Sequence, residues 1–116
     1  MPYIDGNYLN PEIHVGDYGT NFIVTIYDQD GVVFNVSSAT SLAIRFLSPS
    51  GVSTDKTATP LTDGIDGKII YAVEDGLFDE AGEWKYQAKI VFAGGNWTTN
   101  RIKFSVYGNI SAPVVP

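Results

Sequence analysis

The sequence contains no cysteine and a single histidine, His14, and each scarcity removes a class of protein. Without cysteine there is no disulfide framework and no zinc site built on thiolates. One histidine cannot form a histidine-rich metal site, and a Ser-His-Asp triad would have to use that one residue. The composition therefore disfavours an enzyme, and we expect no cofactor.

Positive charge is also scarce. Seven Lys and Arg stand against thirteen Asp and Glu, a formal net charge of −6. A phosphate-binding surface needs clustered cations, so we expect no nucleic-acid partner. We expect no membrane span, because no apolar run approaches the ~20 residues that a spanning helix needs. We also expect no signal peptide, because residues 1–5 lack its basic and apolar regions.

Alternation of apolar and polar residues with a period of two dominates what is present, and it is typical of half-buried strands. Turn-forming residues separate the alternating segments at intervals near ten residues. In a chain of 116 residues this pattern predicts one all-β domain, a β-sandwich of seven or eight antiparallel strands, with a small closed barrel as the alternative. The clearest alternating segments are 20–27, 42–47, 68–73, 84–92 and 102–106.

The last hairpin predicts a β-bulge. Gly94-Gly95 fits a two-residue turn with positive φ, which places Phe92 opposite Trp97. The same register, continued, would point Arg101 into the core, so one extra residue near positions 100–101 is needed to restore the alternation. The predicted pairs are Ile90–Thr99 before the bulge, and Ala88–Ile102, Tyr86–Phe104, Trp84–Val106 and Lys89–Arg101 after it.

The two ends of the chain lack this alternation. We expect an extended N-terminal arm at residues 1–11, the sandwich at 12–108 and a proline-rich C-terminal tail at 109–116. Large apolar side chains left in water commonly mark partner surfaces, so those of the arm are candidate partner-binding residues. The alternative is that the arm folds back over its own domain. The candidates are Tyr3, Ile4, Tyr8 and Leu9.

Residues 80–86, Glu-Ala-Gly-Glu-Trp-Lys-Tyr, resemble the Asp-x-Gly-x-Tyr-x-Cys corner of immunoglobulin domains. Trp84 stands where that corner has its tyrosine, and Tyr86 stands where it has its cysteine. The tyrosine hydroxyl of the corner bonds to the backbone, and here the indole N–H of Trp84 would take that role. The resemblance implies an immunoglobulin-like sandwich.

Four stretches resemble the small immunoglobulin-like module of tailed bacteriophages, and most of all the N-terminal domain of phage baseplate upper proteins. The resemblance spans about residues 15–106. It implies a non-catalytic virion protein that docks onto other virion proteins, on the capsid, the tail or the baseplate, and self-association is a further possibility. The stretches are 16–19, 36–41, 46–51, and 63–68 followed by 82–84.

Five of the seven cations alternate with inward residues and are predicted to lie on outward strand faces. One hypothesis is that they form a basic strip that meets an acidic partner, but simple solvation is favoured, because exposed charges normally have no such role. They are Arg45, Lys85, Lys89, Arg101 and Lys103.

Aromatic side chains suggest a second class of function, a carbohydrate-binding module, because aromatic faces stack on the apolar faces of sugars. Trp97 and Tyr107 are the candidates, although core packing is favoured for Trp97 because of its register with Phe92. The carboxylates at 74–83 could catalyse glycoside hydrolysis only if two of them faced each other across a cleft. We favour the interpretation that they belong to a solvated loop. We expect Asp28 and Asp30 to stabilise the turn that contains them and not to bind a metal ion.

Overall fold

The structure is a computed structural model that describes residues 2–4 and 12–108. This part of the chain folds into ten strands and contains no helix, and therefore none long and apolar enough to cross a membrane. The longer strands are β3 (Asn21–Tyr27), β4 (Ser41–Leu47), β5 (Ser53–Thr57), β7 (Lys68–Ala72), β8 (Gly82–Phe92), β9 (Gly95–Thr98) and β10 (Ile102–Tyr107). The two-residue strands are β1 (Tyr3–Ile4), β2 (Ile13–His14) and β6 (Thr59–Pro60).

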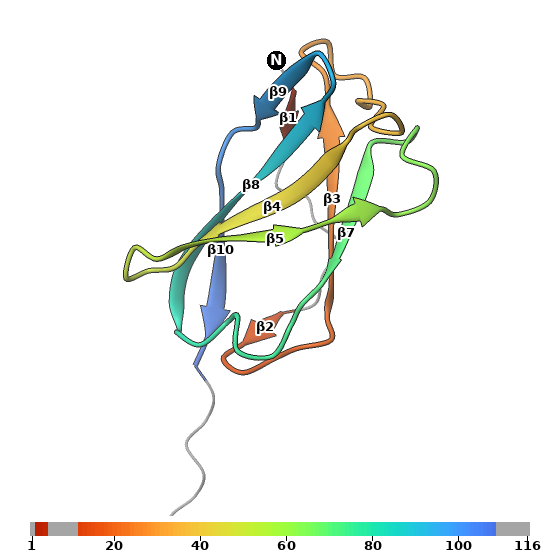
Figure 1. The fold of residues 1–116 in the computed structure, drawn as a ribbon. Coiled ribbons are helices and arrows are strands. Elements are labelled where there is room, and N and C mark those ends of the chain that lie inside the picture. The colour runs from red at the N-terminus through yellow and green to blue at the C-terminus, as the bar shows by residue number, and fades with distance from the viewer. Residues whose placement is uncertain (1, 5–11, 109–116) are drawn as a thin grey trace, which may run out of the picture.

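The strands form two sheets (Figure 1). One has the order β1-β3-β7-β6, and the other has the order β2-β10-β8-β4-β5 with β9 beside β8. These orders match the A-B-E-D and G-F-C-C′ sheets of an immunoglobulin domain. All pairs are antiparallel except β2 with β10, which is parallel. The predicted immunoglobulin-like sandwich is confirmed, and the closed barrel is wrong. The described residues form ten strands rather than the predicted seven or eight, because three strands of two residues are too short to show alternation.

Aromatic rings meeting edge to face fill the space between the sheets. Phe22 of β3 lies 4.9 Å from the ring of Tyr86 and 5.2 Å from that of Phe46, between ring centroids. Such edge-on pairs add about 0.5–1.5 kcal/mol each beyond the area they bury. Phe46 and Tyr86 project from neighbouring strands, since they are directly opposite each other in the β4–β8 pair. The predicted inward residues are therefore the core.

The corner before β8 forms as the sequence predicts. The indole Nε1 of Trp84 donates a hydrogen bond to the backbone oxygen of Glu80 at 2.9 Å. The ring of Phe78, from the preceding loop, packs edge-on against Trp84 at 5.1 Å. This bond satisfies a buried polar N–H that would otherwise destabilise the core.

The predicted bulge is confirmed, but the pairs on either side of it are not. Trp97 lies opposite Ile90 and Ile102 lies opposite Tyr86, so five steps along one strand match four along the other. The extra residue lies within 99–101, which face only Gln87 and Ala88 on β8. Thr99 N donates to Ala88 O at 2.9 Å, and Thr99 Oγ1 accepts a hydrogen bond from Ala88 N at 2.9 Å. A side chain thus replaces the missing ladder bond.

The predicted β8–β9 and β8–β10 pairs are wrong because the turn between β8 and β9 lies one residue earlier than predicted. Phe92 pairs with Gly95, so the turn residues are Ala93-Gly94, and neither Gly94 nor Gly95 has positive φ. The predicted pairs move by two residues, except that of Lys89, whose partner moves by three, from Arg101 to Thr98. Moving a pair by two residues leaves its side chains on their predicted faces. The pairs found in place of those predicted are Ile90–Trp97, Tyr86–Ile102, Trp84–Phe104, Gly82–Val106 and Lys89–Thr98.

The structure describes residues 2–4 of the predicted N-terminal arm, and there the arm folds back onto its own domain, the alternative that the sequence left open. Tyr3 and Ile4 form β1 and pair with Tyr27 and Ile26 of β3. The side chain of Asn100 fixes this short strand, because its Oδ1 accepts from the N of Ile4 at 2.8 Å and its Nδ2 donates to the O of Ile4 at 2.9 Å. The remaining positions of the arm, 1 and 5–11, and the tail, 109–116, lie outside the described residues.

Candidate interaction surfaces

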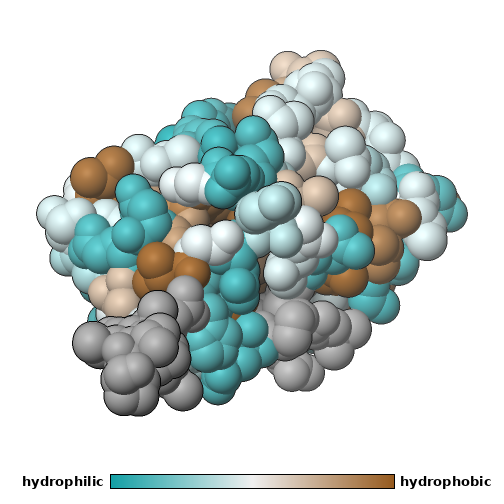
Figure 2. Space-filling model, turned by 90° about the horizontal axis from the view of Figure 1, so that it is seen from below, coloured by the Kyte–Doolittle hydropathy of each residue, from teal (hydrophilic) through white to brown (hydrophobic). Residues whose placement is uncertain are grey.

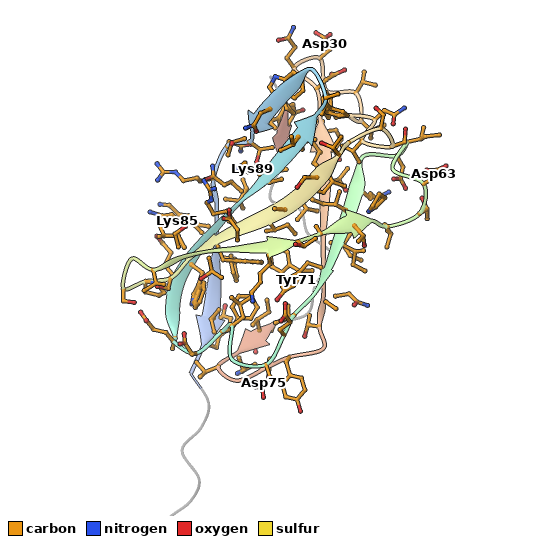
Figure 3. The ribbon with its side chains drawn as sticks, viewed as in Figure 1. Asp30, Asp63, Tyr71, Asp75, Lys85 and Lys89 are labelled. Carbon is orange, nitrogen blue, oxygen red and sulfur yellow. The ribbon has the colours of Figure 1, made fainter. Side chains whose placement is uncertain are left out.

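The outer face of the larger sheet carries four cations from three adjacent strands. Each alternates with a buried residue, so the pleat of the sheet turns it toward solvent. Figure 3 labels two of them, Lys85 and Lys89, along β8. We call this surface the basic face, and it consists of Arg45 on β4, Lys85 and Lys89 on β8, and Lys103 on β10.

Like charges lie side by side on the basic face. Lys85 is directly opposite Lys103 in the antiparallel β8–β10 pair. Such opposed pairs have Cβ atoms about 4.5–5.5 Å apart, and like charges there are destabilising. Of the basic face, only Arg45 has a carboxylate within 4.0 Å among the described residues. The two lysines thus add charge at a cost in stability, in a chain whose net charge is −6.

Arg45 is the cation of the basic face whose charge is neutralised by a carboxylate, that of Asp55. Its Nε donates to Asp55 Oδ1 at 2.6 Å and its Nη2 to Asp55 Oδ2 at 3.0 Å, a two-pronged contact across the β4–β5 pair. The hydrogen bond and the charge of Asp55 raise the pKa of Arg45. The hydrogen bond from Arg45, aided by its charge and that of Lys89, lowers the pKa of Asp55. Asp55 on the edge strand β5 therefore neutralises Arg45, whereas Lys85, Lys89 and Lys103 have no carboxylate within 4.0 Å among the described residues.

Arg101, the fifth predicted cation, is exposed in the connection between β9 and β10 and is not part of a strand. It does not lie opposite Lys89, whose partner is Thr98. The predicted like-charge pair Lys89–Arg101 is therefore wrong, because the turn lies at Ala93-Gly94 and not at Gly94-Gly95. The structure places a like-charge pair instead at Lys85 and Lys103.

A hollow of about 270 Å³ lies at one end of the basic face, beside the β4–β5 turn. It combines an apolar wall with one cation of the face and one carboxylate. A single side chain of a docked protein would fit such a space. The lining residues are Leu47, Ser48, Pro49, Gly51, Glu83 and Lys85.

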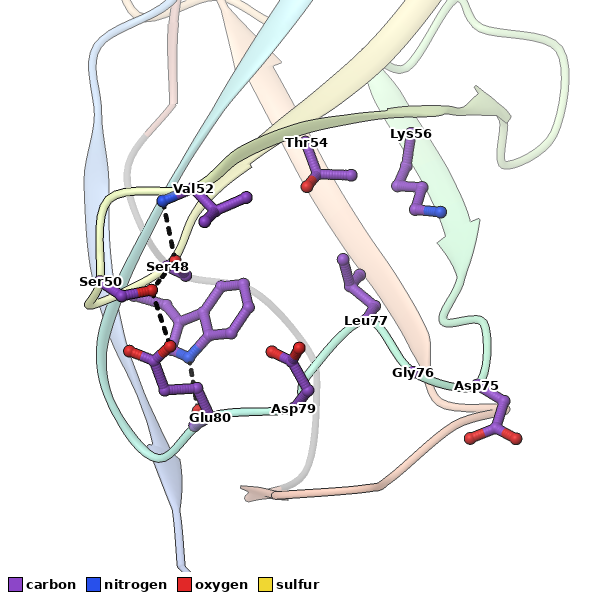
Figure 4. Close-up of a pocket in the computed structure, with 11 residues that line it drawn as sticks. Ser48, Ser50, Val52, Thr54, Lys56, Asp75, Gly76, Leu77, Asp79 and Glu80 are labelled. Carbon is purple, nitrogen blue, oxygen red and sulfur yellow. Dashed lines mark hydrogen bonds between the residues drawn. The ribbon is translucent and has the colours of Figure 1, made fainter.

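A second hollow, of about 260 Å³, lies between β5 and the loop at 75–80, with the buried ring of Trp84 in its wall (Figure 4). Ser50 Oγ donates to Glu80 Oε2 at 2.8 Å and lies 3.1 Å from Ser48 Oγ. The candidate hydrolase carboxylate Glu80 is thus bound within the wall and helps to fix the β4–β5 turn.

The other carboxylate of this loop with described side-chain partners is Glu74. Its Oε1 lies 3.6 Å from Lys56 Nζ and accepts a hydrogen bond from Tyr71 Oη at 3.2 Å. Burial raises the pKa of the Tyr71 hydroxyl, which keeps it protonated as a donor. These contacts are those of a structural network at the edge of the sandwich.

The aspartates of the turns bind their own backbone. Asp28 Oδ1 accepts from the N of Asp30 at 2.9 Å and from the N of Val32 at 3.1 Å. Asp63 Oδ1 accepts likewise from the N of Ile65 at 3.0 Å. Among residues 2–4 and 12–108, no three His, Asp or Glu side chains converge as metal ligands would.

The two aromatic residues predicted to bind a glycan are not brought together. Trp97 lies opposite Ile90, whereas Tyr107 is the neighbour of Val106, which lies opposite Gly82. These partners are eight residues apart on β8, or about 26 Å at the rise of a strand. Tyr107 is 49% exposed and lies near His14, with 5.9 Å between ring centroids. Together they cannot form one platform.

Trp97 is partly buried, and it also lines an open hollow. Its ring meets Phe92 edge-on at 5.5 Å and Phe34 at 6.2 Å. The hollow beside it measures about 280 Å³, and we call it the Trp97 hollow. Sequence reasoning missed its other members, because the 28–34 loop and β9 are about sixty residues apart in the chain. The lining residues are Pro2, Asp28, Gln29, Asp30, Phe34 and Trp97.

The smaller sheet carries an apolar row at this same end. Tyr3 is 36% exposed and stacks on Tyr27, with 5.5 Å between ring centroids, and Val33 bridges to the other side of Tyr27. Of the predicted arm residues, Tyr3 is thus available to a partner, whereas Ile4 is 1% exposed and belongs to the core. Tyr8 and Leu9 lie outside the described residues. At the opposite end, apolar residues form small separate groups among hydrophilic ones (Figure 2).

Comparison with known proteins identifies a fold and no family. No family model matches the sequence, and no curated protein matches it. The crystal structure of CopC from Methylosinus trichosporium OB3b is similar, with a TM-score of 0.58 over 97% of this chain and 100% of that chain. The two sequences are 11% identical, so this similarity concerns the fold alone.

These comparisons overturn the resemblance to the phage baseplate module. CopC, whose structure is similar along nearly the whole of this chain, is not a phage baseplate protein. The stretches that suggested the module are turns and aromatic positions, and a sandwich of this topology requires such residues in any family. The sequence pattern therefore identified the architecture and not the lineage.

Proposed function

We propose that this protein is a non-catalytic binding module whose basic face docks onto an acidic surface of a partner protein. The observation that supports this most directly is the opposed pair Lys85 and Lys103, which has no carboxylate within 4.0 Å in the described structure. An approaching carboxylate would relieve their repulsion, so docking is favoured by more than the simple attraction of one charge pair.

A finer version places the module in a tailed-bacteriophage virion, where it decorates the capsid or joins tail or baseplate components. A connector between neighbouring subunits requires two separate contact sites. The basic face on one sheet and the apolar row on the other provide two such sites. Detection of this chain by mass spectrometry in purified particles, at a fixed ratio to the capsid or tail protein, would test this placement.

The docking proposal is tested with poly-L-glutamate of about twenty residues as the probe. Titration followed by ¹H–¹⁵N NMR should move the backbone amides of β8 and β10 around Lys85 and Lys103, and added salt should weaken the binding. The double variant Lys85→Gln/Lys103→Gln should bind about tenfold more weakly, as expected for a loss of ~1.4 kcal/mol from two partly exposed charges.

The matched control is Lys56→Gln/Lys68→Gln, which removes the same number of charges away from the basic face. It should bind poly-L-glutamate with nearly unchanged affinity. Equal weakening in both double variants, or shifts spread over the whole surface, would mean that only net charge matters and would overturn the docking proposal.

A further inference from the structure

We propose that the Trp97 hollow binds a neutral saccharide ring. The site is separate from the basic face and independent of the docking proposal. It joins an aromatic ring from β9 to the carboxylates of the β3–β4 connection, and Figure 3 labels Asp30 at this end of the molecule. Among residues 2–4 and 12–108, two carboxylates and no Lys or Arg line the hollow, which favours a neutral sugar over an acidic sugar or a phosphate.

The ring of Trp97 is held rigidly in place. A Cβ added to Gly95 would lie 2.5 Å from the Cη2 atom of Trp97, so the ring occupies space that any other residue at position 95 would fill. Phe34 and Phe92 contact the ring at interplanar angles of 73° and 72°. A platform fixed on these sides loses little conformational entropy when a ligand stacks on it.

The acidic wall is equally fixed. Asp28 accepts two amides of its own loop through Oδ1, and its backbone O accepts from the N of Gly31 at 3.0 Å. Gly31 has φ +81°, a conformation that glycine adopts without strain. The loop therefore holds Asp30 in the lining of the hollow, and the described hydrogen bonds of the turn use the carboxylate of Asp28 and not that of Asp30.

A pyranose ring matches this combination. Its C–H groups form an apolar face that stacks on an indole, and its hydroxyls at the ring edge donate hydrogen bonds to carboxylates, which are strong acceptors. The open volume of about 280 Å³ fits one ring at a time. We therefore infer recognition of a terminal or side-branch residue of a glycan.

The two tryptophans allow a direct test. In ¹H–¹⁵N NMR each indole N–H gives its own signal, and Trp84, buried and bonded to Glu80, serves as the internal reference. The probes are methyl glycosides of glucose, galactose, mannose and N-acetylglucosamine at up to about 50 mM. We expect at least one glycoside to shift the Trp97 signal in a saturable way while the Trp84 signal stays in place.

Two variants assign the site. Trp97→Ala should abolish saturable binding, and its folding is checked by the Trp84 indole signal. Asp30→Asn leaves the core untouched and should weaken binding about tenfold, the loss expected for a hydrogen bond to a charged group. Asp75→Asn is the matched control, because Asp75 is an exposed aspartate in the lining of the hollow between β5 and the loop at 75–80. This variant should bind as well as the parent.

The proposal is overturned if no glycoside moves the Trp97 signal, or if Asp30→Asn and Asp75→Asn bind equally. N-acetyl-arginine amide is included as a cationic probe, because an acidic aromatic hollow also suits a basic side chain. A saturable shift with this probe and none with the glycosides would replace the sugar with a basic segment of a protein.

Discussion

The two faces of β8 show how differently one strand constrains its residues. On the inner face, Trp84, Tyr86 and Ile90 are at most 3% exposed and pack against rings from both sheets. On the outer face, Lys85 and Lys89 contribute charge without an ion pair in the described structure. Packing determines which residues the inner face can hold, whereas the solvent-exposed outer face is not subject to that requirement. A substitution should therefore affect stability on one face and binding on the other.

The largest expected effect is at the centre of the inner face. Phe46 meets the rings of Phe22 at 5.2 Å and Phe78 at 5.6 Å. Phe46→Ala removes these contacts and leaves a cavity, which should lower the free energy of unfolding by about 3–5 kcal/mol. Urea denaturation measures it. Arg45→Ala, one residue away on the outer face, should cost less than about 1 kcal/mol. Similar losses in both variants would contradict the difference between the two faces.

A smaller effect is expected where the inner face carries a polar group. Trp84→Phe keeps an aromatic ring but removes the donor to the backbone O of Glu80. We expect a loss of about 1–3 kcal/mol in the free energy of unfolding, because a partly buried carbonyl loses its partner. Trp97→Phe, measured alongside by urea denaturation, should cost less because Trp97 is only partly buried. The reverse order would mean that the corner bond contributes little.

The residues of the inner face could be predicted from the sequence, because a half-buried strand requires apolar and polar residues to alternate. The inward parity of β4, β7 and β8, the corner at Trp84 and the single extra residue in the last hairpin all follow from short-range patterns. These features are local, or they repeat along a strand, so they can be recognised without knowing what lies opposite.

The opposing residues could not be predicted in the same way. The turn at Ala93-Gly94 places Trp97 over Gly95 and beside Phe34, and this tertiary packing competes with the local preference for Gly94-Gly95. Strand β1 has two residues, too few to show alternation, and it is fixed by Asn100 near the other end of the chain. The cations of the basic face were predictable by parity, whereas their pairing and the Trp97 hollow depend on such long-range contacts.

The outer face offers a prediction in which stability and binding change in opposite directions. Lys103→Glu turns the opposed pair with Lys85 into an attractive one. We expect the free energy of unfolding to rise by about 0.2–1 kcal/mol and the affinity for poly-L-glutamate to fall. Ser105→Glu, which faces Glu83, should instead lower stability slightly. A loss of stability in Lys103→Glu would show that the lysine pair is not repulsive.

The smallest effect concerns the one compensated cation of the basic face. Arg45 lowers the pKa of Asp55, so the folded state binds the Asp55 proton more weakly than the unfolded state does. The resulting stabilisation is fully present above the unfolded pKa of about 3.9 and disappears as the pH falls through the lower folded pKa. Both side chains are more than a third exposed, at 35% and 45%, so we expect less than about 1 kcal/mol.

Comparing the parent with Asp55→Asn by urea denaturation between pH 7 and pH 2 isolates this contribution. The parent should be the more stable protein from pH 7 to about pH 5, and the gap should close below about pH 4. A gap that stays constant down to pH 2 would mean that the carboxylate stabilises β5 by packing rather than by charge. The outer face would then resemble the inner one, and the lysines beside Asp55 would need a structural explanation as well.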